Sequence, residues 1–272
     1  MDVYISADVE GVAGVVDRAQ IMPGENDYAI GRSLMTEEAN AAIDGAFAAG
    51  ATRVVVNDAH ARMSNLLPDA VDLRANLILG KYKPMYMLQG LDSTFDAAFF
   101  VGYHGSIGEP EAILSHTYNP RAIWETRVDG NVVGELGINV LVCDYYGVPL
   151  RLVTGDQAVA AEARASVAGV HVAEVKRSFG RFSAESLSPS RSRDLIQAEA
   201  RSCLQSIPTA KAVRRAVTVE LTFLVADMAS MAEWIRGVKR CGARTVSFDA
   251  SDGLEAYRTF YTIITLTRGL VD

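Results

Sequence analysis

The chain begins with the stretch Met1-Asp2-Val3-Tyr4-Ile5-Ser6-Ala7-Asp8-Val9-Glu10-Gly11. The apolar run from Val3 to Ala7 predicts a β-strand, and acidic residues follow it directly. Because strand side chains alternate between two faces, Asp8 and Glu10 are expected to emerge on the same side. At the carboxyl end of the first strand of an open α/β sheet, they would lie where such folds bind their ligands.

Short apolar runs alternate with longer helical patterns along the chain that follows. This alternation is typical of βαβ units, so the predicted class is α/β, with a largely parallel sheet flanked by helices. Glycine is expected just past the end of a helix, and Gly50 and Gly147 end the two clearest ones. The predicted strands are Val3–Ala7, Arg53–Val56, Ala98–Val101 and Leu150–Val153, and the predicted helices are Ile30–Ala49 and Leu136–Tyr146.

The composition changes after about residue 155. We therefore expect a metal-binding catalytic α/β domain over residues 1–155 and a smaller α/β domain over residues 156–272, which serves oligomerisation and closure of the site. Within the latter, Ser188 before Pro189 fits the N-cap and first position of a helix. The elements predicted there are helix Gln157–Val167, strand Val170–Val175, helix Pro189–Gln205, strand Ala216–Leu224, helix Ala229–Arg240, strand Thr245–Phe248 and a terminal helix from Leu254.

The composition is that of a soluble globular protein. The 272 residues include 26 Lys and Arg against 33 Asp and Glu, for a net charge of −7, and 49% are hydrophobic. An acidic balance without a basic run argues against nucleic acid as a partner. The first residues lack the basic region and the cleavage site typical of a signal peptide, so none is expected, and no stretch approaches the roughly 20 apolar residues of a membrane span. Three cysteines, each in a helix-like segment, make no disulfide framework, so we expect a cytoplasmic protein without a membrane partner.

Three of the four histidines fall at or just beyond the ends of such apolar, strand-like runs. They are His60, His104 and His116, whereas His171 stands between valines and is expected to be structural. Parallel strands would deliver these imidazoles and the first-strand carboxylates to one crevice. Imidazole and carboxylate are the ligands that zinc and its neighbours prefer, so the pattern predicts a metal site.

Two further acidic residues are candidates for this site. Glu135 opens a predicted helix between Gly134 and Gly137. The helix dipole favours an acid there, which makes capping the simpler interpretation, but flanking glycines allow the close backbone approach that suits a ligand. Asp58 precedes His60 by two residues and is expected to orient that ligand.

Five motifs occur in order along the chain and carry these candidates. They are Ser6-x-Asp8-x-Glu10-Gly11, Asn57-Asp58-x-His60, Gly102-Tyr103-His104, Ser115-His116 and Gly134-Glu135-Leu136-Gly137. In order and spacing they resemble the motifs of the DppA-type zinc D-aminopeptidases. The similarity extends to Met35–Asn40 and Leu254–Tyr257, and so covers nearly the whole chain.

The resemblance implies a binuclear zinc peptidase that removes an N-terminal D-amino acid from short peptides such as D-Ala-D-Ala. It also implies two α/β domains and a ten-subunit, ring-like particle with an internal chamber. Two zinc ions per subunit would be bound, with Asp8 bridging them and His116 as the catalytic histidine, described in the family as a nucleophile. The implied metal ligands are Asp8, Glu10, His60, His104 and Glu135.

The residues leave two roles open for His116. It could attack the carbonyl directly, or it could transfer a proton and stabilise the oxyanion. We favour the second role, because histidine carries protons readily near neutral pH and a metal-activated water already supplies a nucleophile.

Other functions remain open at this stage. Another metal-dependent amidase or phosphoesterase could use the same ligands, since fold and ligands alone do not settle the reaction. The absence of a glycine-rich phosphate cradle argues against phosphoryl substrates. A non-enzymatic peptide-binding or metal-storing protein would have no need of His116. The segment from Gly105 to Glu111 departs from the family pattern by two extra acids, Glu109 and Glu111, which could favour the free ammonium group of a substrate or simply face water.

Overall fold

A seven-stranded sheet dominates the computed structural model, which describes residues 1–208 and 211–270. Its strand order is β3-β2-β1-β4-β7-β8-β9, and every pairing is parallel except that of β8 with β9. The predicted α/β class with a largely parallel sheet is confirmed. The strands are β1 (Asp2–Ala7), β2 (Arg53–Asp58), β3 (Ala75–Ile78), β4 (Ala97–Tyr103), β7 (Leu150–Asp156), β8 (His171–Gly180) and β9 (Ser183–Ser186).

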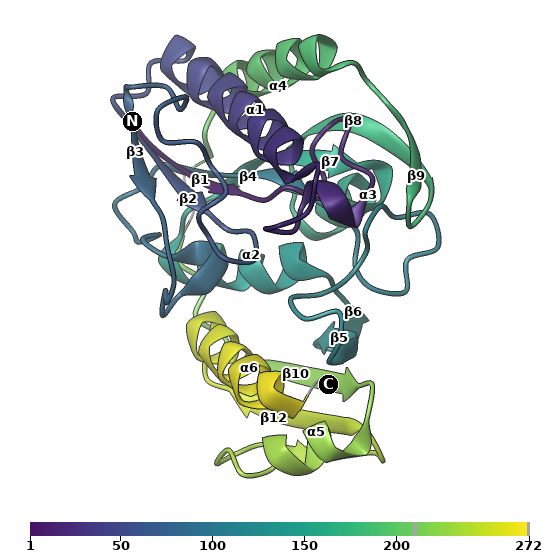
Figure 1. The fold of residues 1–272 in the computed structure, drawn as a ribbon. Coiled ribbons are helices and arrows are strands. Elements are labelled where there is room, and N and C mark those ends of the chain that lie inside the picture. The colour runs from purple at the N-terminus through teal and green to yellow at the C-terminus, as the bar shows by residue number, and fades with distance from the viewer. Residues whose placement is uncertain (209–210, 271–272) are drawn as a thin grey trace. The chain divides into compact units, whose positions relative to one another are not determined.

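Two long helices lie side by side against this sheet, α1 (Tyr28–Ala48) and α4 (Pro189–Cys203) (Figure 1). They approach closely where Gly45 of α1 meets Ala200 of α4, since a Cβ on Gly45 would lie 2.5 Å from that of Ala200. A third helix, α3 (Gln157–Ser166), packs against β7 and β8. Single turns of 3-10 helix occur at Arg18–Gln20 and Tyr86–Leu88.

The order of the strands places the first strand at the point where a ligand site is expected. From β1 the chain adds β2 and β3 on one side, and then continues with β4, β7 and β8 on the other. The winding direction therefore reverses between β1 and β4. In open α/β sheets, such a switch point leaves a crevice at the carboxyl ends of the strands, which is where ligands bind.

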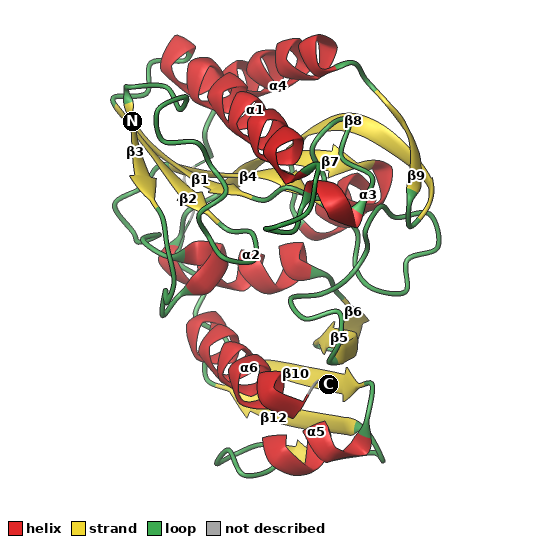
Figure 2. Ribbon diagram, viewed as in Figure 1, coloured by secondary structure: helices red, strands yellow, loops and turns green. Residues whose placement is uncertain are grey.

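A second sheet has the order β11-β12-β10-β5-β6, with antiparallel pairing throughout. Figure 2 shows its strands together with the helices that accompany them. The elements are β5 (Ile123–Val128), β6 (Asn131–Val132), β10 (Val217–Phe223), β11 (Lys239–Arg240), β12 (Thr245–Ala250), α2 (Glu135–Tyr146), α5 (Ala226–Ala232), α6 (Gly253–Thr267) and a final 3-10 turn at Arg268–Leu270.

The two sheets belong to two compact units. The first comprises Met1–Gly105, Pro110–Leu114 and Val148–Ala210, and the second Ser106–Glu109, Ser115–Gly147 and Lys211–Asp272. This division differs from a single boundary at residue 155. The physical reason is strand pairing, because β7 and β8 extend the parallel sheet of β4, whereas β5 pairs with the distant β10.

Most of the predicted elements are present, but the region after residue 229 differs. The helix expected over Ala229–Arg240 is instead the shorter α5, and Lys239 and Arg240 pair with β12. Gly237 lies between α5 and Lys239 and has φ 93°, a backbone conformation through which a helix cannot continue. Cys241 consequently lies exposed after a strand rather than in a helix, while the buried Cys143 and Cys203 lie in α2 and α4.

No helix in the described part of the chain has both the length and the apolar character needed to cross a membrane. All three cysteines are free thiols.

Glycine allows the ends of β1 and β4 to come together. The Asp8 amide donates to the Val101 carbonyl at 2.8 Å, and the Gly11 amide donates to the Gly102 carbonyl at 2.8 Å. Gly102 has φ 73°, and a Cβ there would lie 2.3 Å from the Asp8 carbonyl oxygen. A Cβ on Gly11 would lie 1.8 Å from the Tyr103 carbonyl oxygen. Any side chain at these positions would push the two strand ends apart.

We predict that Gly102→Ala lowers the free energy of unfolding by about 2–5 kcal/mol, combining the left-handed backbone with overpacking. Gly50→Ala is the matched control, since Gly50 has φ 94° and a Cβ added there would meet no atom within 4 Å. This control should lose only about 1–2 kcal/mol from the backbone conformation. Urea unfolding of both variants measures the difference, and equal losses would contradict the close approach.

Candidate metal centre

The strand ends of the first unit bring four predicted ligands into one buried cluster. Asp8 and Glu10 follow β1, His60 follows β2 and His104 follows β4, and all four are at most 5% exposed. Since β1 lies between β2 and β4, its carboxylates stand next to both histidine-bearing loops. The sequence prediction that these residues converge is confirmed within this unit.

His60 faces the two carboxylates with one ring nitrogen. Its Nδ1 lies 3.2 Å from Asp8 Oδ1 and 3.0 Å from Glu10 Oε2. Its Nε2 lies 3.0 Å from the Ile21 carbonyl oxygen, which can only accept a hydrogen bond. This partner assigns the proton of the neutral ring to Nε2 and leaves the Nδ1 lone pair directed at the carboxylates. A lone pair among carboxylate oxygens calls for a cation between them.

His104 faces Asp8 from the other side. Its Nδ1 lies 2.9 Å from the Gly105 carbonyl oxygen, and this contact directs Nε2 toward Asp8, where Nε2 is 3.7 Å from Oδ2. Asp8 therefore turns one carboxylate oxygen to His60 and the other to His104. This is the arrangement of a carboxylate that can serve two cations at once.

The charges of the cluster also favour a cation. Burial raises the pKa of Asp8 to about 7, and repulsion from Glu10 adds to the increase. Burial alone lowers the pKa of His60. In the absence of a metal ion, however, the charge of Glu10 and the hydrogen bonds that a protonated Nδ1 donates to Asp8 and Glu10 hold this pKa well above its ordinary value. The cluster therefore retains protons that a divalent metal ion would displace.

Asp8, Glu10 and His60 satisfy the geometric requirement for a metal site. Each offers one ligand atom, and these atoms lie within 4.8 Å of one another. Two carboxylates and an imidazole are donors that zinc accepts. The donor set of this unit therefore fits zinc.

Asp58 holds the loop that carries His60, although not through the imidazole as expected. Its carboxylate accepts hydrogen bonds from the amides of Asn65 and Leu66 and from Asn65 Nδ2. Asn65 Nδ2 also donates to the His60 carbonyl at 2.7 Å. Asp58 thus fixes the backbone around His60, and the Ile21 carbonyl orients the His60 imidazole.

Backbone strain is concentrated in the loops that carry the candidates. Ala61 and Met63, beside His60, have φ 43° and 56°, and Leu114 and Tyr118, on either side of His116, have φ 46° and 59°. Non-glycine residues adopt this region at an energetic cost, and such residues cluster at functional sites.

The second unit brings together the two remaining candidates. His116 Nε2 lies 3.5 Å from Glu135 Oε1, and the same oxygen accepts a hydrogen bond of 2.7 Å from the Tyr118 amide. Glu135 is the first residue of α2, as predicted, with Gly134 as N-cap. The Tyr118 hydroxyl donates to Asn139 Oδ1 at 2.6 Å and so ties the loop to the same helix.

The remaining expectations have mixed outcomes. His171 is structural, as predicted, with its Nδ1 2.8 Å from Glu199 Oε2. Glu109 and Glu111 are exposed. No sequence pattern predicts the parts played by Asn65 and Tyr118, because their contacts with Asp58, Glu135 and Asn139 form only in the folded loops.

Comparisons with known proteins identify the family to which the chain belongs. The model of the M55 peptidase family, described as D-aminopeptidase, matches residues 1–262. A D-aminopeptidase of Bacillus subtilis (strain 168) is 36% identical over 273 residues, which cover 98% of this chain and 97% of the relative.

The fold has a close counterpart among solved structures. The zinc-dependent D-aminopeptidase DppA from Bacillus subtilis, described as a self-compartmentalizing protease, matches with a TM-score of 0.94 and 35% identity. The match covers 98% of each chain. On the full-length family match and this similarity, the chain belongs to the D-aminopeptidase family of peptidases, M55.

Proposed function

We propose that this protein is a zinc-dependent aminopeptidase that removes the N-terminal D-amino acid from short peptides such as D-Ala-D-Ala. It binds two zinc ions per subunit. The membership in the D-aminopeptidase family and the full-length similarity to a zinc-dependent relative support the activity. The proposed ligands are Asp8, Glu10, His60, His104 and Glu135.

The orientation of Asp8 carries the proposal of two ions. One of its oxygens faces His60 and the other faces His104, so each oxygen has its own imidazole as a co-ligand. Two cations held close together repel each other, and a carboxylate between them reduces this repulsion. Glu10 and Glu135 add further negative charge to the ligand set.

Zinc, when bound, supplies a Lewis acid for the scissile carbonyl and lowers the pKa of a water molecule toward neutrality. The side chains of the protein supply the rest of the chemistry. Asp8, Glu10 and His60 would hold the metal, and the burial of the two carboxylates strengthens their attraction for a cation.

His116 is proposed to carry the proton to the leaving amine. Its side chain is 15% exposed, so a substrate can reach the ring, and its Nε2 faces Glu135 at 3.5 Å. The carboxylate stabilises the protonated imidazole that forms between taking up a proton and releasing it. General acid–base catalysis of this kind contributes about 10²–10⁴-fold to a rate.

The proposal extends to assembly and location. The solved relative is described as self-compartmentalizing, and this supports a closed homo-oligomer, which we propose to be a decamer with contacts formed by the C-terminal part of the chain. A chamber would admit short peptides and exclude folded proteins. We also propose a cytoplasmic location, with which the three free cysteines are compatible.

The proposed reaction is tested by comparing D-Ala-D-Ala with L-Ala-L-Ala, using zinc-loaded protein and a chelated control. We expect cleavage of the D-peptide alone and its loss on chelation, because the ions take part in the reaction. Cleavage of the L-peptide would retain the metal mechanism but contradict the stereochemistry. Zinc-loaded protein that cleaves neither peptide would favour another metal-dependent amidase or a binding protein.

We predict that His116→Ala retains both zinc ions and lowers kcat about 10²–10⁴-fold, because only the proton carrier is lost. His171→Ala is the matched control, since this histidine is bound to Glu199 and lies outside the proposed site. The control should keep both its zinc and its activity. Zinc content by elemental analysis and steady-state kinetics provide the measurement, and loss of zinc from His116→Ala would show that His116 is a ligand instead.

A further inference from the structure

A buried lysine makes three hydrogen bonds to the loop that carries Glu10. Lys176 lies on β8 and is 4% exposed. Its Nζ donates to the carbonyl oxygens of Glu10 at 2.6 Å, Val12 at 2.8 Å and Val15 at 2.6 Å. An ammonium group has three N–H donors, so all of them are used on this one loop.

These bonds are strong in their surroundings. Hydrogen bonds from a charged donor are roughly twice as strong as neutral ones, and a buried ammonium is costly unless fully bonded. The carboxylates of Glu38, Asp156 and Glu10 attract the ammonium as well. Removing the charge would take this donor away from three carbonyl groups and would remove the attraction to these carboxylates.

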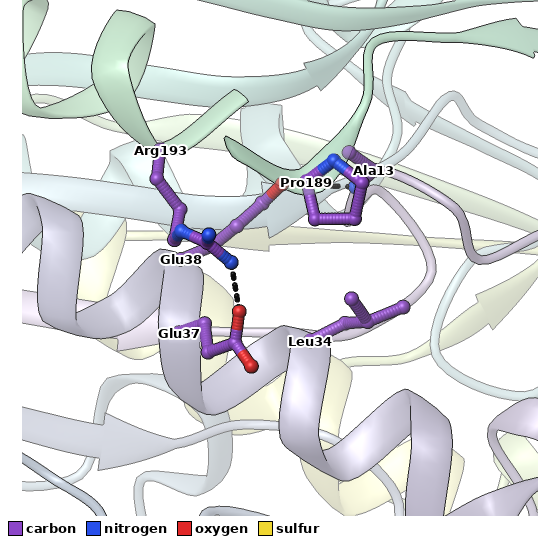
Figure 3. Close-up of a pocket in the computed structure, with 6 residues that line it drawn as sticks. All are labelled: Ala13, Leu34, Glu37, Glu38, Pro189 and Arg193. Atoms are coloured by element: carbon purple, nitrogen blue, oxygen red, sulfur yellow. Dashed lines mark hydrogen bonds and ion pairs between the residues drawn. The ribbon is translucent and has the colours of Figure 1, made fainter. Parts of the chain in front are cut away.

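The loop itself has no regular structure between β1 and the 3-10 turn at Arg18. Neighbouring elements therefore hold its backbone. Glu38 of α1 accepts a hydrogen bond of 2.9 Å from the Ala13 amide, and the two residues lie together in Figure 3, beside the ion pair of Glu37 with Arg193. Ser186 of β9 accepts a bond of 2.9 Å from the Gly14 amide. Lys176 differs from these anchors because it binds the peptide group of Glu10 itself.

We propose that Lys176 is a positioning residue of the metal centre, whose ammonium fixes the backbone of Glu10 and so directs the Glu10 carboxylate toward His60. This inference rests on the proposed role of Glu10 as a zinc ligand. The positions of the backbone N, Cα and C atoms of a residue set the direction of its Cα–Cβ bond. Locking the Glu10 carbonyl therefore limits where Oε2 can lie, at 3.0 Å from His60 Nδ1.

The second buried lysine of the described chain supports this view. Lys83 is also 4% exposed, and its Nζ donates to Asn57 Oδ1 at 2.7 Å, the Asp58 carbonyl at 2.7 Å and the Ile78 carbonyl at 3.0 Å. It thus holds the end of β2 directly before His60. Each buried ammonium fixes the chain next to a candidate ligand, one beside β1 and one beside β2.

The test measures the zinc affinity of metal-free protein by competition with a chromophoric chelator. Lys176→Met should bind zinc about 10- to 100-fold more weakly than wild type, the usual effect of losing a residue that orients a ligand. Lys176→Ala should behave alike and should regain affinity in n-propylammonium, which replaces the atoms removed. Lys176→Met, whose longer side chain fills the space, should show no such rescue.

Arg151→Met is the matched control. Arg151 is a buried cation of β7, and its guanidinium donates to the carbonyls of Cys203, Gly169 and Ser206 at the start of that strand. Lys176 instead lies opposite Asp156, the last residue of β7, in the pairing of β7 with β8. The Arg151→Met substitution should lower the melting temperature of the protein but leave its zinc affinity unchanged.

Two results would overturn the inference: unchanged zinc affinity in folded Lys176→Met or Lys176→Ala, or equal weakening in Arg151→Met. If Lys176→Met does not fold, Lys176→Gln, which keeps two N–H donors, should fold and bind zinc with intermediate affinity, and wild-type affinity in it would also contradict the inference. Wild-type protein that binds no zinc would instead contradict the proposed function, and with it the inference.

Discussion

Two carboxylates and an imidazole placed together in a buried space impose the main constraint on this structure. Asp8 and Glu10 both lie within hydrogen-bonding distance of His60, and all three are almost completely inaccessible to solvent. Buried charges of one sign destabilise a fold unless a cation compensates them. Protons can partly do so, as the raised pKa of Asp8 shows, but a divalent ion compensates more charge in the same space. The parallel sheet, its switch point and the surrounding loops serve to hold this cluster.

Holding the cluster requires well-defined backbone positions, and the chain achieves them with different devices. Gly102 and Gly11 permit the end of β4 to touch the loop after β1. The Asp58 carboxylate accepts hydrogen bonds from amides of the loop after His60. The Lys176 ammonium donates hydrogen bonds to carbonyls of the loop that contains Glu10. The charge of each anchor is opposite to the partial charge of the backbone groups it binds, so the anchors are stabilised where an uncharged residue would not be.

The sequence predicted the strand ends well because their signals are local. A strand that runs directly into acidic residues, as at Asp8, needs no long-range information to interpret. The class of the fold and the clustering of four candidate ligands followed from the repetition of this pattern over three strands. The region beyond residue 229 was predicted less well, since a turn at Gly237 and the pairing of Lys239 with Ser247 end a pattern that reads as helix.

The role of Lys176 and the boundaries of the two units could not be predicted, for another reason. Lys176 lies 166 positions from Glu10 in sequence, and no periodicity connects them. Likewise, β5 finds its partner β10 across the whole of β7, β8 and α4, so a change of composition at residue 155 does not reveal where one unit ends. Such relations depend on tertiary packing, which a single sequence read locally does not contain.

We propose that Asp8 lies between two zinc ions at the ends of β1, β2 and β4. Anomalous X-ray diffraction at the zinc absorption edge, from crystals of the zinc-loaded protein, tests this arrangement directly. We expect two anomalous peaks, one on either side of the Asp8 carboxylate, with one of them about 2.0–2.1 Å from His60 Nδ1. A single peak, or zinc bound away from Asp8, would contradict it.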